Sequence, residues 1–132
     1  MGYRSDVGYT IEFKDKETMA LFLAEIKSKD EYKEALEDAR NEDTGREGLD
    51  ISEDKLRINY YATGVKWYDE YSDVQSHEAL LDLAREYRDE HEKQVEYAFA
   101  RIGEEGSDVE NYASDDGYEL VWVSRQIIFD ED

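Results

Sequence analysis

The chain of 132 residues carries 36 acidic residues against 16 basic ones, so its formal net charge is −20 at pH 7. Its length suits one domain, and its 39 % hydrophobic and 13 % aromatic content argues against disorder. This charge repels nucleic acid and anionic membranes and attracts basic surfaces. Cysteine is absent, which excludes disulfides and cysteine-based metal sites. Because no apolar run could span a membrane, we expect a cytoplasmic protein that contacts neither membrane nor nucleic acid directly.

The N-terminal part of the chain is typical of a strand followed by helices. Over residues 7–13, apolar residues occupy every second position, which predicts a half-buried strand. Asp15 can cap the next element, a helix whose apolar residues recur with helical spacing over residues 19–26. A second helical piece is expected over residues 30–39, and an acidic loop with glycines follows at about residues 40–54.

The central part predicts another strand and the longest helix. In the strand, residues 56–67, Thr63 and Gly64 interrupt the apolar alternation. A long strand with a bulge fits this interruption, and so do two strands around a tight bend. Residues 72–91 then carry a helical stripe of leucine, alanine and tyrosine.

The C-terminal part predicts two further strands. Residues 95–100 alternate, whereas residues 118–129 are apolar on both faces, which indicates a central place in the sheet. The predicted order is β-α-β-α-β-β, in which strand-helix-strand units imply parallel crossovers. We therefore predict an α+β fold, a single compact domain over residues 1–132. Its mixed β-sheet has four to five strands, with two main helices packed on one face.

Aromatic residues, carboxylates and a histidine concentrate in one segment, GVKWYDEYSDVQSHEALLDLA. Asp69, Asp73 and His77 could hold a metal or move a proton, because positions 73 and 77 lie one helical turn apart. A structural interpretation competes, since Ser72 and Gln75 match an S-x-x-Q capping box. One histidine with two carboxylates offers few ligands for zinc. We therefore favour the structural interpretation and expect no metal and no other cofactor.

Other catalytic signatures are missing from the sequence. It contains no G-x-x-x-x-G-K or G-x-G-x-x-G phosphate loop, no EF-hand loop and no G-x-S-x-G elbow. Because the chain has two histidines, few residues could serve as the base of a nucleophilic triad. We expect a protein that is not an enzyme, and the alternative function is a metal-assisted or acid–base enzyme centred on Asp69, Asp73 and His77.

Acidic residues form a dense block over residues 30–54. Such runs usually form a solvated surface, and a saline habitat would favour the same composition. A more specific interpretation is DNA mimicry, because B-DNA carries one charge per about 1.7 Å and an acidic helix face can imitate that row. The partner-binding residues expected from this block are Tyr32, Glu34, Glu37, Asp38, Glu42 and Asp43.

The eleven tyrosines suit an interface, because tyrosine combines a rigid ring with a hydroxyl group. Some lie on the apolar faces of predicted strands and are expected in the core: Tyr9, Tyr60 and Tyr97. Others are not explained by the core and are interface candidates: Tyr32, Tyr68, Tyr71 and Tyr112. We include Tyr68 and Tyr71 in the predicted partner-binding set.

Three segments, MGYRSDV, VKWYDEYSDVQSHEAL and AFARIGEE with the following SDVE, resemble small bacteriophage proteins. Those proteins begin with the same heptapeptide and carry a similar VKWY-D-x-Y-x-DV-x-x-HE block. The resemblance implies a phage-type accessory protein in the host cytoplasm, and by analogy with acidic phage inhibitors it favours anti-defence DNA mimicry. The partner would be a host protein with a basic, nucleic-acid-binding surface. A modulator of host polymerase and a homo-oligomeric structural phage component remain open.

Overall fold

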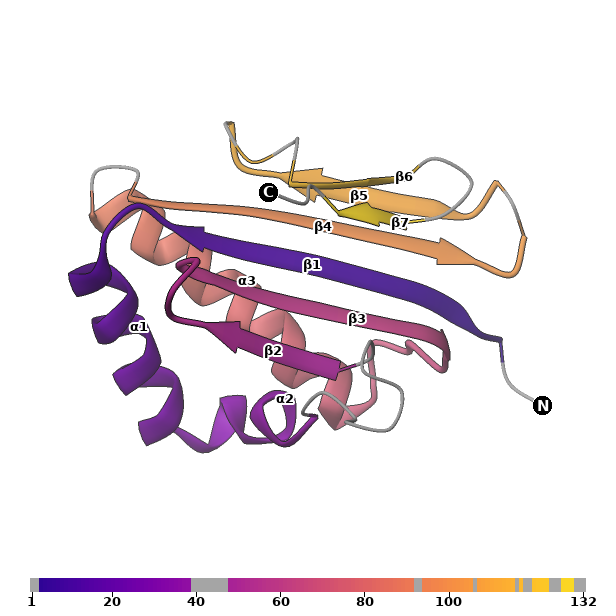
Figure 1. Cartoon of the computed structure of the whole chain (residues 1–132). Helices are drawn as coiled ribbons and strands as arrows, with labels where there is room; N and C mark the ends of the chain where they lie inside the picture. The colour runs from indigo at the N-terminus through magenta and orange to yellow at the C-terminus, as the bar shows by residue number, and fades with distance from the viewer. Residues whose placement is uncertain are drawn as a thin grey trace.

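The structure is a computed structural model. It describes residues 3–38, 48–91, 94–105, 107–115, 117, 120–123 and 127–129. The fold is α+β, with a five-stranded antiparallel sheet and a separate two-stranded sheet (Figure 1). The helical elements are α1 (Lys16–Ser28), the 3₁₀ turn η1 (Asp30–Tyr32), α2 (Lys33–Glu37) and α3 (Ser72–Glu90). The strands are β1 (Ser5–Phe13), β2 (Gly48–Ser52), β3 (Arg57–Val65), β4 (Val95–Gly103), β5 (Val109–Ala113), β6 (Val121–Val123) and β7 (Ile127–Phe129).

The strand order of the large sheet is β2-β3-β1-β4-β5, and every neighbouring pair is antiparallel. The predicted mixed sheet is therefore wrong. The connection from β1 to β2 skips one strand position in the sheet, which β3 occupies. The connection from β3 to β4 likewise skips the position that β1 occupies. Each helical crossover thus joins two strands that are not neighbours, which is the split β-α-β connectivity.

Several predicted elements are confirmed. The strand near residue 7, the helix after Asp15, the long helix and the strand from residue 95 correspond to β1, α1, α3 and β4. Asp15 caps α1, since its Oδ1 accepts the N–H of Thr18 at 2.7 Å. Of the two alternatives for the central strand, the bulge is correct. The register of β3 against β1 shifts there, and Gly64 has a φ of 62°, which glycine adopts at little cost.

Other predictions need correction. The strand β2 lies inside the expected acidic loop, where carboxylates on the flanking positions obscure its apolar alternation. Residues 118–129 were expected to form a central strand, but the sheet positions beside β4 are taken by β1 and β5. Instead, β6 and β7 pair with each other as an antiparallel two-stranded sheet that contacts β4 and β1. Small residues of the sheet, Ala98 and Ala100, pack with Leu120 there, which lets the chain approach closely.

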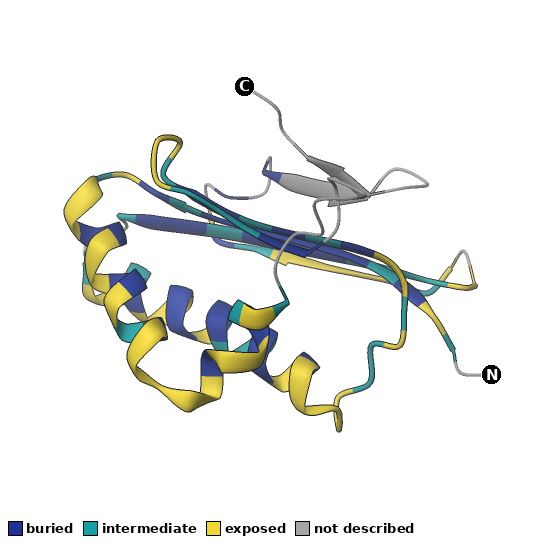
Figure 2. Cartoon of the chain, turned by 60° about the horizontal axis from the view of Figure 1, so that its bottom comes forward, coloured by how far each residue is buried: buried dark blue, intermediate teal, exposed yellow. Residues whose placement is uncertain are grey.

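The main core lies between the sheet and the helices (Figure 2). Val7, Tyr9, Ile11 and Phe13 point from β1 towards α1 and α3, and each is at most 2 % exposed. Burial of each large apolar side chain contributes about 1.5–3 kcal/mol to folding, so this layer fixes the helices on the sheet. In the part of the chain that the structure describes, none of the helices combines the length and apolarity that a membrane crossing needs.

Candidate functional site

Two side-chain hydrogen bonds join α2 to the first turns of α3. The hydroxyl of Ser72 donates to Oε1 of Glu34 at 3.0 Å, and the N–H of Ala35 donates to the hydroxyl of Ser76 at 3.0 Å. The second bond is buried, so it holds the two helices together. The predicted residues of α2 therefore lie beside the start of α3, although the two helices are far apart in sequence.

Two of the predicted tyrosines pack against each other just before α3. The rings of Tyr68 and Tyr71 are 5.1 Å apart at an angle of 70°, an edge-to-face contact. Tyr71 is 38 % exposed, whereas Tyr68 is half-buried and its hydroxyl accepts the N–H of Tyr3 at 2.6 Å. Tyr68 therefore supports the ring of Tyr71, and Tyr71 is the one that faces solvent.

Exposed carboxylates flank this tyrosine pair in the sequence, and the bond from Ser72 to Glu34 brings the start of α2 next to it. Those of α2 and those at the start of α3 are all exposed, and the positive end of the α3 dipole stabilises the nearest of them. We define the α2–α3 surface by the residues Glu34, Glu37, Asp69, Glu70, Tyr71 and Asp73. It combines negative charge from two elements with one exposed aromatic ring.

Some of the predicted partner-binding residues do not belong to this surface. Tyr32 is only 4 % exposed, so its expected role as a surface aromatic contact is wrong. Burial, followed by the nearby charge of Glu31, raises the pKa of its hydroxyl, as expected for a phenol in the core. Glu42 and Asp43 lie outside the described residues.

Asp38 has a structural partner that the sequence analysis missed. The imidazole of His77, which is 1 % exposed, lies with Nε2 at 3.0 Å from Oδ2 of Asp38 and with Nδ1 at 2.6 Å from the hydroxyl of Tyr9. A carboxylate can only accept, so the consistent tautomer carries its proton on Nε2 and accepts from Tyr9. Burial raises the pKa of Tyr9 well above its usual value, which keeps this hydroxyl protonated.

The alternative site of Asp69, Asp73 and His77 is not assembled. His77 binds Asp38 and Tyr9 and packs on the ring of Tyr60 at 4.2 Å. Asp73 instead accepts the N–H of the residue after it. Among the residues with described positions, no three histidine or acidic side chains gather as ligands for a metal ion. An open pocket lies elsewhere, lined by Lys16, Met19, Ala20, Glu53, Asp54 and Leu56.

The predicted capping box is also wrong. Helix α3 has Tyr71 at its N-cap, which forms no side-chain cap hydrogen bond. Ser72 bonds to Glu34 instead, and the amide of Gln75 donates to the backbone carbonyl of Asp69 at 3.0 Å. The polar residues of this segment therefore connect α3 to its neighbours.

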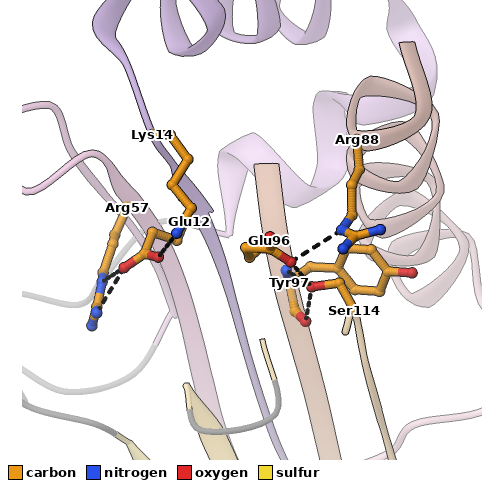
Figure 3. A network of polar contacts seen from close by, with 7 residues as sticks. All are labelled: Glu12, Lys14, Arg57, Arg88, Glu96, Tyr97 and Ser114. Carbon is orange, nitrogen blue, oxygen red and sulfur yellow. Dashed lines mark hydrogen bonds and ion pairs between the residues drawn. The ribbon is translucent and has the colours of Figure 1, made fainter. Parts of the chain in front are cut away.

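A second buried polar cluster lies at the start of β4, beside the end of α3 (Figure 3). Glu96 is 1 % exposed and accepts from Nε of Arg88 at 3.0 Å and from the hydroxyl of Ser114 at 2.6 Å. The same hydroxyl accepts the N–H of Tyr97 at 2.9 Å. The one sequence signal for this cluster is that Glu96 shares a face of β4 with Ala98 and Ala100, at two-residue spacing. The cluster attaches the chain just after β5 to β4 and α3.

We compared the chain with protein-family models, with curated proteins and with solved structures, and found no match. The resemblance to bacteriophage proteins therefore stays a prediction. The α2–α3 surface and the net charge of −20 are the features of the molecule that bear on function.

Proposed function

We propose that the protein binds a host nucleic-acid-binding protein through the α2–α3 surface and inhibits or modulates it, as a phage-type accessory protein. One observation supports the proposal: the bond from Ser72 to Glu34 brings the acidic helix α2 beside the acidic segment that carries the exposed ring of Tyr71. In this proposal the carboxylates occupy the positions that DNA phosphates take on the partner. The protein acts by binding, without catalysis, cofactor or direct contact with nucleic acid.

The physical basis is complementarity of charge and shape. A net charge of −20 steers a basic partner towards the molecule and speeds association at low salt. The ring of Tyr71 adds rigid apolar area to the α2–α3 surface and can contact a lysine or arginine by cation–π interaction. Charge alone gives attraction with little specificity, whereas a fixed aromatic ring among the charges selects one docking geometry.

The decisive variant replaces both Glu34 and Glu37 by Lys. Both side chains are exposed, and the bond from Ser72 to Glu34 is an exposed one, so we expect the fold to persist. Asp38 is left unchanged because it binds His77. The matched control reverses Asp89 and Glu90, which are exposed near the other end of α3 and change the net charge equally.

The experiment is a pull-down from lysate of the bacterial host at low and high salt, with the captured proteins identified by mass spectrometry. We expect a nucleic-acid-binding protein that is released by salt and displaced by added duplex DNA. Its capture should fall at least about tenfold with the α2 variant and within about threefold with the control. If the α2 variant captures the same protein as well as the parent does, the proposal is wrong.

A further inference from the structure

The strand β5 forms one edge of the large sheet. Its side chains are largely exposed: Val109 is 44 % and Tyr112 is 41 % exposed. Within the described part of the chain, β5 pairs only with β4. An edge strand presents unpaired backbone groups, which is why another chain can add to it.

The hydrogen bonds at the two ends of the pairing show which backbone groups point outward. The N–H of Ser114 donates to the carbonyl of Tyr97 at 2.9 Å, and the N–H of Gly103 donates to the carbonyl of Asp108 at 2.8 Å. In an antiparallel ladder such bonded pairs alternate with non-bonded pairs. The intervening register therefore directs the N–H and C=O groups of Asn111 and Ala113 away from β4.

Ion pairs and hydrogen bonds hold β5 near both of its ends. At the start, the guanidinium of Arg101 donates to both carboxylate oxygens of Asp108, at 2.9 and 3.2 Å, and to Glu110 at 3.0 Å. At the end, Ser114 is fixed by Glu96 at 2.6 Å. The open edge is therefore already extended, and an incoming strand has to order only itself.

The face of β5 towards α3 carries an aromatic ring among carboxylates. Tyr112 stacks on Phe99 with ring centroids 5.0 Å apart. Partial burial raises the pKa of Tyr112, and the charges of Glu78, Asp82 and Glu110 raise it further. Glu78 also has a raised pKa, because of partial burial and then the nearby carboxylates. Arg85 binds Asp82 at 3.0 Å and Arg101 binds Glu110 at 3.0 Å, so three carboxylates stand against two guanidinium groups and this face keeps a negative charge.

We propose that the open edge of β5 accepts an extended segment of a basic partner as an additional antiparallel or parallel strand. Backbone bonds to Asn111 and Ala113 provide the affinity, as in other cases of strand addition. Lysine or arginine at alternate positions of the segment lies on the face of Tyr112 and pairs with Glu78, while Asp82 and Glu110, which already bind Arg85 and Arg101, add to the attraction. A second copy of this chain fits poorly, because each copy has a net charge of −20. The α2–α3 surface is not required, so this inference does not depend on the proposed function.

The test uses a fluorescently labelled peptide of about seven residues in which lysine alternates with valine, a length that matches a typical strand. Three further peptides serve as comparisons: one with glutamate for lysine, one with the lysines grouped at one end, and one N-methylated on alternate backbone amides. Fluorescence anisotropy at low and high salt measures affinity, and hydrogen exchange measures protection of the amides of Asn111 and Ala113. We expect binding and protection with the alternating peptide, and at least about tenfold weaker binding with each of the other three.

The matched protein variants are Asn111→Pro and Asn111→Thr. Proline removes an N–H that the ladder with β4 does not use, and an edge position tolerates it. Threonine keeps the N–H and favours a strand. We expect Asn111→Pro to bind at least about tenfold more weakly than the parent, and Asn111→Thr to bind within about twofold. Circular dichroism and thermal unfolding establish that both variants fold.

Three results would overturn the inference. The first is equal binding of the N-methylated and unmodified peptides, which would leave charge as the whole cause. The second is the absence of binding at low salt to a folded parent protein. The third is sedimentation as a dimer that Asn111→Pro abolishes, because a second copy would then occupy the edge. The double variant Glu34→Lys and Glu37→Lys should still bind the peptide. Failure of the proposed function can therefore be distinguished from failure of this inference.

Discussion

The two edges of the large sheet differ in what lies beside them. At the β2 edge, the outward N–H of Leu49 donates to the backbone carbonyl of Asp38 at 2.7 Å, and Leu49 is 6 % exposed. At the β5 edge, Asn111 is exposed and its backbone groups point away from β4. One edge is closed by the end of α2, whereas none of the described strands pairs with the outward groups of the other edge.

The difference shows how this chain controls strand addition. The bonds from Ala35 to Ser76 and between Asp38 and His77 hold the end of α2 on α3, and the backbone carbonyl of Asp38 closes the β2 edge. The edge of β5 is protected by its short length and its charge, which are common defences against unwanted pairing. The negative charge of the protein repels acidic chains and other copies of the protein, but it attracts basic chains. The open edge is therefore selective in the partners it admits.

The largest effect is expected from Glu96→Ala, which releases the end of β5. Arg88, whose side chain is 12 % exposed, then keeps only the longer ion pair of 3.7 Å to the exposed Asp115 among its described carboxylate partners. Breaking a buried ion pair from one side costs about 3–5 kcal/mol, which denaturant unfolding would measure as a lower free energy of unfolding. Adding Arg88→Met should recover part of the loss.

Glu110→Ala is the control, because this exposed carboxylate should contribute less than about 1 kcal/mol. Similar losses in the free energy of unfolding for Glu96→Ala and Glu110→Ala would show that the buried position of Glu96 does not matter.

A smaller effect is expected from His77→Ala, which acts on the closed edge. The variant leaves the Tyr9 hydroxyl without its partner and opens a cavity beside Tyr60, at a cost of about 2–4 kcal/mol. It also frees Asp38, so the amide of Leu49 should exchange with solvent faster than the amides of β4. His91→Ala is the control, because His91 is half-exposed and packs only on the rim of the core. Unchanged exchange at Leu49 would show that Asp38 does not need His77.

The smallest effect is expected from Asp108→Asn, at the start of β5. Hydrogen bonds from Arg101 and then from Tyr3 lower the pKa of Asp108 below its ordinary value of 3.8. A lowered folded-state pKa stabilises the protein above the unfolded value, and this contribution disappears as pH falls through the folded value. The difference in free energy of unfolding between parent and variant should therefore be present near neutral pH and shrink below pH 3.8.

Urea unfolding across this pH range measures that difference. The variant Asp89→Asn, which removes one exposed carboxylate of α3, serves as the control. A difference for Asp108→Asn that stays constant from neutral to acid pH would show that the carboxylate charge is not the cause.

The sequence predicted elements whose pattern is long and local. β1, α1, α3 and β4 each show a clear apolar period, and the side chain of Asp15 caps a helix within its own segment. β2 and β5 were missed because each has five residues, too few for a period to stand out among acidic neighbours. The antiparallel order could not be derived either, because a crossover that passes over a strand has the same local pattern as one that does not.

The candidate site shows the same limit. Exposed glutamates on α2 were recognisable from charge alone, but the burial of Tyr32 depends on how η1 packs against α3. In the sequence, His77 groups with Asp69 and Asp73 of its own segment, whereas the packing of α2 on α3 brings Asp38 to His77. The burial of Glu96 could not be derived, because its partners Arg88 and Ser114 lie on other segments.

The place of β1 in the sheet has a consequence for biosynthesis. β1 pairs with β3 and β4 on its two sides, yet it is synthesised before either neighbour. Its apolar residues Val7, Tyr9 and Ile11 must wait for distant segments, and such non-local pairing slows folding. We therefore expect nascent-chain folding to begin with the β2–β3 hairpin and α3, while the earliest strand remains a client for chaperones until β4 has left the ribosome.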